Sequence, residues 1–329
     1  MDIKNLKINF EAKVLQAEKV IIVPHNNVDF DAIGSAIGLA YIVKKLKKEP
    51  YILINDSTDS LEQGIRIVID EAKREYSIFN KEKYLEVKKD DDLIILTDVN
   101  KKGMISIGDE VNNKENTIII DHHNGDHTTL ESDNVFIDSD ISSASEIVTK
   151  LICLSKVKCP VNVANYLLAG IYLDTNRLSK NVTAETMKVV AKLMEYGADL
   201  NRVNDLFLED FNSDRRVQDL VSRVEIITYT IATILADENM IYSREELAKA
   251  ADYLLKFGVD ASFCVGKIDE NVVSISARSR EKINVGEVME QLDGGGNQYS
   301  AATKLQDVSI QEAGKRLLKV IEPSCYVKK

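Results

Sequence analysis

The chain has 329 residues, of which 44% are apolar and 29% charged, and its 42 basic and 53 acidic side chains give a formal net charge of −11. This composition is that of a globular protein with about two domains, and it excludes a fibre, a mini-protein and a disordered tail. The acidic balance and the lack of tryptophan argue against a protein that wraps duplex nucleic acid or stacks long single strands.

The sequence contains no sign of a membrane span or a secretion signal. A span needs roughly 18 uninterrupted apolar residues, and the first residues, MDIKNLKINFEAKV, carry charges where a signal peptide needs its apolar stretch. The four cysteines, Cys153, Cys159, Cys264 and Cys325, form no CxxC pair and are expected to be reduced core residues. We therefore expect a cytoplasmic protein without membrane contact.

The first 130 residues alternate short apolar runs with helical or charged stretches. The apolar runs are KVIIVP (19–24), YILIND (51–56), LIILTD (93–98) and TIIID (117–121), and the last three end in an acidic residue. Residues 31–47 have the spacing of an amphipathic helix. Near-continuous apolar strands of this kind predict a parallel α/β sheet.

The later residues predict more helices and then a second domain. From about residue 143 to 197 the pattern is mostly helical, with a turn at DTNR. Residues 201–216 are polar and charged, which predicts a linker between domains at 1–200 and 217–329. The second domain mixes strands, one of them at IITYTIATIL (226–235), with helices, and this order fits a smaller α+β domain.

All four histidines lie in two short segments, HNNVDFD (25–31) and DHHNGDH (121–127). In an open α/β sheet, ligands bind in the crevice outside the carboxyl ends of the strands, where Asp29, Asp98 and Asp121 would lie. Imidazole together with carboxylate suits manganese, iron or zinc better than calcium. The strand ends are therefore candidates for a metal site.

Each of these features also has a simpler explanation. Asp31 alone would suit the N-cap of the following helix, and a histidine pair such as His122 and His123 is often structural or merely exposed. Adjacent histidines point in different directions, so only one of the pair is expected to be a ligand, while the other would orient the site or move a proton. Asp98 and Asp174 are single carboxylates of the kind that cap helices or close turns. Gathered in one crevice, however, these acids would repel one another and would need a cation.

The second domain holds two features that could bind a phosphate. Gly294, Gly295 and Gly296, followed by Asn297, can present backbone N–H groups to an anion, although ordinary loops use such runs too. Arg278 could pair with a phosphate through two N–H groups, but surface arginines are usually just solvated. The residues by themselves leave phosphate binding open.

Six motifs occur in order along nearly the whole chain: HNNVDFDAIGSA, LTD at 96–98, DHH at 121–123, LAGIYLDT at 168–175, SARS at 276–279 and GGGNQYSAAT at 294–303. Together they resemble the DHH phosphoesterase family. SARS and the glycine run mark its DHH-associated C-terminal domain, which separates the chain from the manganese-dependent inorganic pyrophosphatases that share the N-terminal motifs. The resemblance implies a parallel-sheet DHH domain with helices on both faces, a smaller α+β domain, and an active site in the cleft between them.

Within the family, the chain is most similar to the catalytic module of bacterial cyclic-di-AMP phosphodiesterases, and oligoribonucleases come second. The stretches that carry this similarity are SASEIVTKLI, LLAGIYLDTN, GADLNRV and DASFCVGKIDENVVSISARS. The similarity implies hydrolysis of cyclic-di-AMP to pApA, or of a related short nucleotide, and homodimerisation by analogy. In membrane-anchored members this module follows transmembrane and sensory domains. We expect a free-standing version here, because the sequence starts close to the phosphoesterase domain.

The resemblance further implies a two-manganese centre. His25 and Asp29 would hold one ion, Asp31 and His122 would hold the other, and Asp98 and Asp174 would bridge or share them. Two divalent ions would neutralise the four carboxylates, so the acidic chain can accept a phosphodiester. A hydroxide bound by both ions would attack phosphorus, and Asp98 would be essential because it contacts both ions.

In this scheme His123 would orient the site or help to protonate the leaving group, and Arg278 with the glycines at 294–296 would hold the phosphate that does not react. The family usually has histidine after the glycine run, where this chain has Asn297, and close relatives often have another glycine at Asp293. That departure bears on substrate recognition rather than on metal binding, because an amide replaces an imidazole. Two other functions stay open: a hydrolase of oligoribonucleotides, pApA or adenosine bisphosphate, and a nucleotide-binding module without catalysis.

Overall fold

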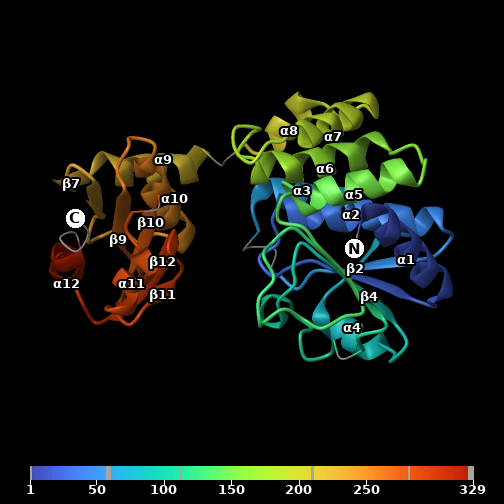
Figure 1. Ribbon diagram of the computed structural model, residues 1–329. Coiled ribbons are helices and arrows are strands. Elements are labelled where there is room, and N and C mark those ends of the chain that lie inside the picture. Colours follow the sequence, from blue (N-terminus) through green and yellow to red (C-terminus); the bar gives the residue numbers. More distant parts are fainter. Residues whose placement is uncertain (1, 57–60, 112, 209–210, 281, 325–329) are drawn as a thin grey trace. The chain divides into compact units, whose positions relative to one another are not determined.

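The computed structural model describes residues 2–56, 61–111, 113–208, 211–280 and 282–324. These residues form two compact units that divide between Leu208 and Glu209, and each unit is described by itself (Figure 1). Among the helices in these ranges, none combines the length and the apolar character that crossing a membrane requires.

The first unit is built on a six-stranded sheet in which every strand pair is parallel. The strand order is β3-β2-β1-β4-β5-β6. The strands are β1 (Val20–Val23), β2 (Pro50–Leu53), β3 (Ser77–Phe79), β4 (Leu93–Thr97), β5 (Thr117–Asp121) and β6 (Asn134–Ile137). This sheet confirms the parallel α/β fold predicted from the apolar runs.

Alternate residues of the central strands enter two different cores. In β1, Val20 and Ile22 belong to the larger core, and Ile21 and Val23 belong to the smaller core on the opposite face. Successive strand residues point to opposite faces, and a parallel sheet covered on both faces must be apolar at every position. The apolar runs are therefore continuous because neither face of these strands meets water.

Helices cover both faces of this sheet. Figure 1 shows α2, α5 and α6 stacked on one side of the sheet and α4 on the other. The helices of this unit are α1 (Ile3–Gln16), α2 (Phe30–Lys45), α3 (Gln63–Ala72), α4 (Lys81–Val87), α5 (Ala144–Leu154), α6 (Val161–Asp174), α7 (Ala184–Glu195) and α8 (Leu200–Leu206), with a 3-10 turn at Lys102–Met104.

Helix α2 approaches its neighbours closely because it carries small residues. A Cβ atom on Gly34 would lie 2.5 Å from the carbonyl oxygen of Tyr166 in α6, and one on Gly38 would lie 2.7 Å from Val148 in α5. Larger side chains at these positions would push the helices apart. The first turn of α2, which carries Asp31, is thereby held against α5 and α6.

The second unit contains a mixed six-stranded sheet in the order β11-β12-β10-β9-β8-β7, in which β8 and β9 are parallel and the other pairs are antiparallel. The strands are β7 (Val224–Thr228), β8 (Ile231–Leu235), β9 (Ala261–Asp269), β10 (Val272–Ser279), β11 (Gly295–Gly296) and β12 (Ser300–Gln306). The helices are α9 (Phe211–Ser222), α10 (Arg244–Leu255), α11 (Val285–Glu290) and α12 (Ile310–Ser324). Its core is separate from those of the first unit, so the expectation of a smaller α+β domain is confirmed.

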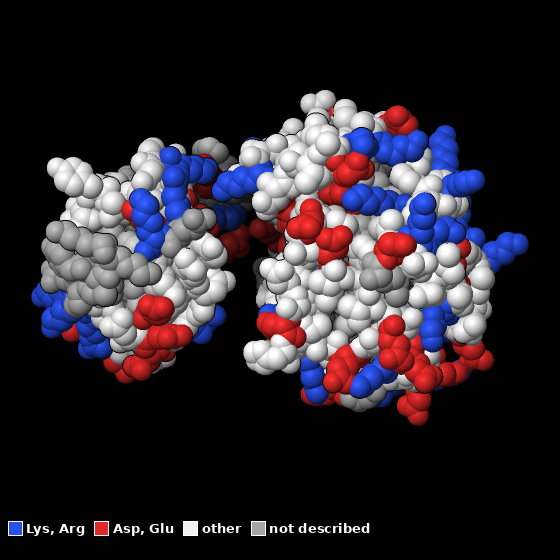
Figure 2. All heavy atoms as spheres, viewed as in Figure 1, with Lys and Arg blue, Asp and Glu red and all other residues white. Residues whose placement is uncertain are grey.

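Helices occupy most of residues 201–216, where the sequence predicts a linker. Helix α8 belongs to the first unit and α9 to the second, and the units divide after Leu208. Cys159 and Cys264 are buried, Cys153 is partly exposed, and all three are free thiols, while Cys325 lies outside the described residues. Figure 2 shows acidic and basic side chains interspersed over the visible face of the first unit.

Candidate metal centre

The carboxyl ends of three neighbouring strands bring the predicted metal ligands together in the first unit. His25 follows β1 in the chain, Asp98 follows β4 directly, and His122 follows β5 directly. Because β1, β4 and β5 are adjacent and parallel, their ends meet at one edge of the sheet. The other ligands come from helix ends: Asp29 and Asp31 from the start of α2, and Asp174 from the last position of α6.

The ligand atoms form two groups that share one carboxylate. In the first group, His25 Nε2 lies 3.6 Å from Asp29 Oδ2 and 3.4 Å from Asp98 Oδ2. In the second group, His122 Nε2 lies 3.3 Å from the other oxygen of Asp98, Oδ1. The same nitrogen is 3.0 Å from Asp174 Oδ2 and 3.9 Å from Asp31 Oδ2. Asp98 therefore points one oxygen at each group.

The donor atoms fit divalent ions. Asp98 Oδ1 and His122 Nε2 are both buried and have no hydrogen-bond partner. Two ligand atoms that each lie about 2.1 Å from the same ion, with a right angle between the two bonds, are roughly 3 Å apart. The distances between the ligand atoms given above are close to this value. The backbone at Asp98 is in the left-handed region, with φ of 57°, a conformation that costs energy in a non-glycine residue and is typical of functional sites.

Asp29 and Asp31 have different roles at the start of α2. Asp29 is the N-cap, since its Oδ1 accepts hydrogen bonds from the N–H groups of Asp31 and Ala32, both at 2.9 Å. The simpler explanation of Asp31 as an N-cap is thus wrong. The fully buried carboxylate of Asp31 accepts hydrogen bonds from the N–H groups of Ala144 and Ser145 at the start of α5. These bonds hold Asp31 in place beside His122.

The electrostatics of the cluster favour bound positive charge. Burial raises the pKa of Asp31 well above its usual value, and the charges of Asp98 and Asp174 raise it further. Burial opposes a charged imidazole at His25, but its contacts with Asp29 and Asp98 raise the pKa of His25 to about 11. The acids around His122 likewise outweigh its burial and raise its pKa to about 11. In the absence of a metal, protons on these two rings offset part of the negative charge of the four carboxylates, and metal ions would displace these protons.

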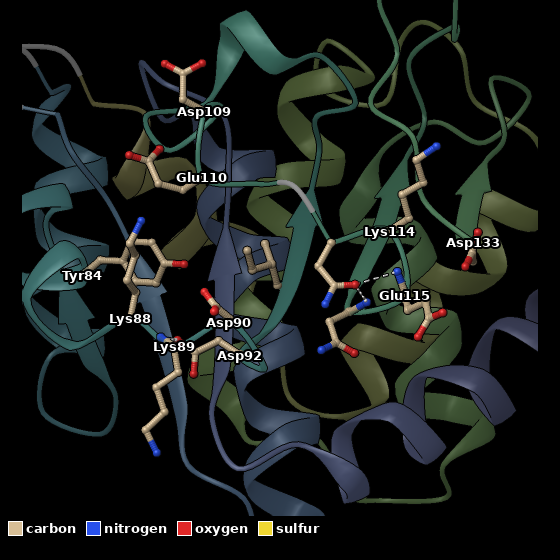
Figure 3. Close-up of a pocket in the computed structure, with 13 residues that line it drawn as sticks. Tyr84, Lys88, Lys89, Asp90, Asp92, Asp109, Glu110, Lys114, Glu115 and Asp133 are labelled. Atoms are coloured by element: carbon tan, nitrogen blue, oxygen red, sulfur yellow. Dashed lines mark hydrogen bonds between the residues drawn. The ribbon is translucent and has the colours of Figure 1, made fainter.

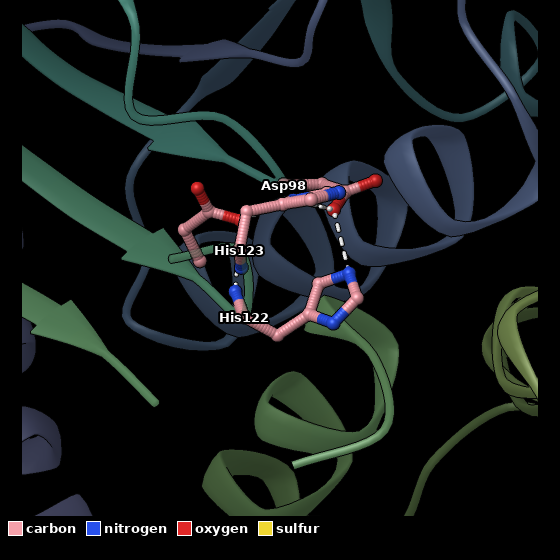
Figure 4. Close-up of side chains that lie close together, drawn as sticks. Asp98, His122 and His123 are labelled. Atoms are coloured by element: carbon pink, nitrogen blue, oxygen red, sulfur yellow. Dashed lines mark hydrogen bonds and ion pairs between the residues drawn. The ribbon is translucent and has the colours of Figure 1, made fainter. Parts of the chain in front are cut away.

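A second layer of hydrogen bonds orients the two adjacent histidines (Figure 4). Asp121 Oδ1 accepts hydrogen bonds from the backbone N–H groups of His122 and His123, and it lies 2.9 Å from His123 Nδ1. Asp121 Oδ2 accepts a 2.6 Å hydrogen bond from the side chain of buried Asn100. The hydrogen bond with Asp121 raises the pKa of His123. His122 consequently faces the buried carboxylates, whereas His123 is half exposed.

A pocket of about 290 Å³ opens over the cluster and is lined by His25, Asp29, Asp98, Asp174 and His123. Asp121, which the sequence also places at a strand end, is part of the wall, and the remaining lining residues were not predicted from the sequence: Val99, Asn100, Lys101, Met104 and Asn124. Several of them directly follow Asp98 or His123 in the chain, and that proximity is the one signal that could have identified them. The Lys101 ammonium group pairs with Asp126 at 2.8 Å, beside the pocket.

The predicted phosphate-binding residues lie together in the second unit. Arg278 on β10 is paired in register with Ser300 on β12, and β12 also pairs with the glycines of β11. Asn297 Oδ1 accepts hydrogen bonds from the N–H groups of Tyr299 and Ser300 and so closes the turn before β12. The Arg278 Nε atom donates a 3.0 Å hydrogen bond to Asp252. The predicted site residues therefore form two groups, one in each unit.

Glycine is required within this run by close packing. Gly296 has φ of 150°, and a Cβ atom there would lie 2.5 Å from the side chain of Ala301. A Cβ atom on Gly294 would lie 2.5 Å from the Thr303 side chain. Gly295, by contrast, has open space around it. Close contact with β12 thus accounts for Gly294 and Gly296, and the open space at Gly295 leaves room for a ligand to approach the backbone.

Comparisons with known proteins agree with this architecture. Residues 19–171 match the DHH family, N-terminal domain, and residues 227–325 match the DHHA1 domain. The chain is 31% identical to the cyclic-di-AMP phosphodiesterase GdpP of Bacillus subtilis and 28% identical to the cyclic-di-AMP phosphodiesterase PdeA of Listeria monocytogenes. Each alignment covers 94% of this chain and 48% of the relative, so the chain spans about half the length of these relatives.

A solved structure shares the fold. The exopolyphosphatase-related protein from Bacteroides fragilis superposes with a TM-score of 0.79 at 20% sequence identity. The superposition covers 97% of this chain and 96% of that protein. The similarity extends over both units.

Proposed function

The chain belongs to the DHH phosphoesterase family, and from this premise we propose that it is a metal-dependent phosphodiesterase that hydrolyses cyclic-di-AMP to pApA. The observation that carries the proposal is the pair of ligand groups that share Asp98 at the strand ends. The substrate is suggested by the relatives named as cyclic-di-AMP phosphodiesterases, which align with nearly all of this chain.

Six side chains would hold two divalent ions: His25 and Asp29 for one, Asp31, His122 and Asp174 for the other, and Asp98 for both. We propose manganese, because mixed imidazole and carboxylate donors suit it. When bound, the ions would offset the four carboxylates, stabilise charge on a phosphodiester and lower the pKa of a water molecule. The chain itself supplies the spacing of the donors and excludes water from Asp31 and Asp98, which are 0% and 3% exposed.

His123 is placed to handle a proton in this reaction. Its Nδ1 atom faces Asp121, and an N–H group at Nδ1 would donate a hydrogen bond to that carboxylate. The other ring nitrogen, Nε2, would then be the atom that donates a proton to the leaving 3′-oxygen. The hydrogen bond with Asp121 raises the pKa of His123, which favours the protonated ring that a proton donor requires. The rings of His122 and His123 lie 4.3 Å apart between their centres, so the proton donor stands next to a ligand.

A second candidate is a hydrolase of linear dinucleotides such as pApA. Asn297 bears on this choice, because its side-chain oxygen already accepts hydrogen bonds from two N–H groups of its own turn. The histidine that the family usually has at this position carries an imidazole ring, whose reach differs from that of the Asn297 amide. We therefore expect the contacts between this position and the substrate to differ from those of the usual family pattern. In either case we propose that Arg278 and the glycine run bind the phosphate that does not react.

Product analysis by chromatography tests these functions. The chain would be incubated with Mn²⁺ and, in parallel, cyclic-di-AMP, pApA and cyclic-di-GMP. The proposal predicts that cyclic-di-AMP is opened to pApA, that a chelator stops the reaction and that added Mn²⁺ restores it. Cleavage of pApA alone would establish the second candidate, and binding without turnover of any substrate would point to a nucleotide-binding module instead.

A further inference from the structure

The first unit contains a second and larger pocket, of about 700 Å³, at the opposite ends of the strands that carry the metal centre (Figure 3). It is lined by Asp92 and Ile94 at the amino end of β4, whereas Asp98 lies at the carboxyl end of the same strand. Figure 3 shows Tyr84, Asp92 and Glu110 on one side of the pocket and Glu115 on the other. The catalytic proposal leaves this pocket without a role.

The lining of this pocket is strongly acidic. Six acids line it, Asp90, Asp92, Asp109, Glu110, Glu115 and Asp133, against the three lysines Lys88, Lys89 and Lys114. Two of these lysines are engaged by acids outside the lining, Lys89 by Glu18 and Lys114 by Glu131. If Asp109 is also counted as neutralised, by Lys102, five acids of the lining remain against one lysine, Lys88. The pocket therefore attracts cations.

Two carboxylate oxygens in the lining are buried without a hydrogen-bond partner. They are Asp92 Oδ1 and Glu110 Oε2. Asp92 is 4% exposed, and its other oxygen accepts a hydrogen bond from the N–H group of Lys89. The nearest cation, Lys19, lies 3.9 Å from Asp92 Oδ1 and donates its 2.6 Å hydrogen bond to the carbonyl oxygen of Val87 instead. A buried carboxylate oxygen without a donor is costly, so an ammonium group that donates a hydrogen bond to either oxygen would be bound favourably.

A buried tyrosine completes the acidic wall. Burial, together with the charges of Asp92 and Glu110, raises the pKa of Tyr84 to about 12, so its phenol stays neutral. An aromatic ring beside carboxylates is a favourable environment for an ammonium group, which the ring face attracts.

The arrangement of the acids points to an organic cation rather than to a metal ion. Among the described residues, the groups of three or more side chains whose ligand atoms lie within 4.8 Å of one another are all at the metal centre. The acids of this pocket are instead spread over its walls, and no three of them converge on one point. Separated carboxylates suit an extended molecule with several ammonium groups, each of which carries N–H donors. We propose that this pocket binds a linear aliphatic polyamine, with ammonium groups at Asp92 and Glu110.

Isothermal titration calorimetry of the full chain with spermidine tests this proposal. The titration would be run at about 0.15 M salt, which screens loose surface attraction, and with Mn²⁺ present to fill the metal centre. The test variant is Asp92→Asn with Glu110→Gln. The matched control, Asp70→Asn with Glu195→Gln, removes the same charge from two exposed carboxylates that pair with surface lysines.

We expect one spermidine per chain, binding at least tenfold weaker in the test variant, and unchanged binding in the control and in Asp98→Asn. If the test variant does not fold, Asp90→Asn replaces it, because the Asp90 residue is exposed, and binding should weaken at least threefold. Three results would overturn the proposal: no saturable binding, an equal loss in the control, or saturable binding of Mg²⁺ alone that depends on Asp92 and Glu110 while spermidine does not bind.

Discussion

Asp98 is the residue on which both ligand groups depend. Its two oxygens face different histidines, at 3.4 Å from His25 Nε2 and 3.3 Å from His122 Nε2. The sequence motifs predicted this residue and its five partners as ligands of one centre, and the structure brings these side chains together. The motifs were not sufficient to separate the N-cap role of Asp29 from the buried position of Asp31, because that difference depends on the N–H groups of Ala144 and Ser145, more than 100 residues away in the chain.

Replacement of Asp98 by asparagine should lower turnover of cyclic-di-AMP by at least about 100-fold. Asparagine can offer its carbonyl oxygen to one ion, but its amide nitrogen is no ligand for the other. The measurement is the initial rate of pApA release in saturating Mn²⁺, with Asp70→Asn as the control at an exposed carboxylate. A rate within threefold of that of the unmodified chain would refute the shared role of Asp98.

Asn100 is a positioning residue that sequence reasoning missed. Its side chain holds Asp121, which in turn holds His123, and this chain of contacts exists only in three dimensions. We expect Asn100→Ala to lower kcat about 10- to 100-fold, because Asp121 orients both His123 and the backbone of the ligand His122. KM should change little, since Asn100 acts through Asp121, and Asn100→Ser should restore part of the rate. The positioning role would be contradicted if Asn100→Ala raised KM and left kcat unchanged. It would also be contradicted if Asn100→Ser lowered kcat as much as Asn100→Ala does.

At the scale of elements, the apolar runs predicted β1, β2, β4 and β5 well because burial on both faces leaves an unmistakable pattern. The short strands β3 and β6 were missed, since they are only partly buried. The segment 226–235 was predicted as one strand, but it spans the end of β7 and all of β8, which form an antiparallel pair. The connection at Tyr229 and Thr230 contains no glycine, proline, asparagine or aspartate, so the usual turn signal is absent.

The close packing of α2 against α6 gives a prediction for stability. Gly34→Ala should destabilise the first unit by roughly 1–3 kcal/mol, because the new Cβ would meet the backbone of α6 and would force the helices apart. Gly103→Ala is the matched control, since a Cβ there meets nothing within 4 Å. Urea denaturation followed by circular dichroism measures both. Equal stability of the two variants would show that α2 and α6 can separate at little cost.

At the scale of the whole molecule, the acidic cluster predicts that the stability of the first unit depends on bound cations. Four carboxylates converge there, and two of the three histidines that meet them have pKa values raised to about 11. A ligand that binds only the folded state stabilises it, by about 2.7 kcal/mol at 100 times its dissociation constant. The global composition, with its charge of −11, gave no hint of this local dependence, because net charge is a sum over the whole surface.

Thermal unfolding should report this dependence directly. Addition of Mn²⁺ to the chelator-treated chain should raise Tm by several degrees, and renewed chelation should reverse the rise. In Asp98→Asn the rise should be much smaller. An equal rise in this variant would place the stabilising ions elsewhere, for example in the acidic pocket at the amino ends of the strands.

The most direct test of the metal centre is anomalous X-ray diffraction at the manganese absorption edge, from crystals of the chain grown with Mn²⁺. We predict two anomalous peaks, one on each side of the Asp98 carboxylate, the first beside His25 and the second beside His122. A single peak, or manganese bound only away from Asp98, would contradict the two-ion centre and with it the proposed chemistry.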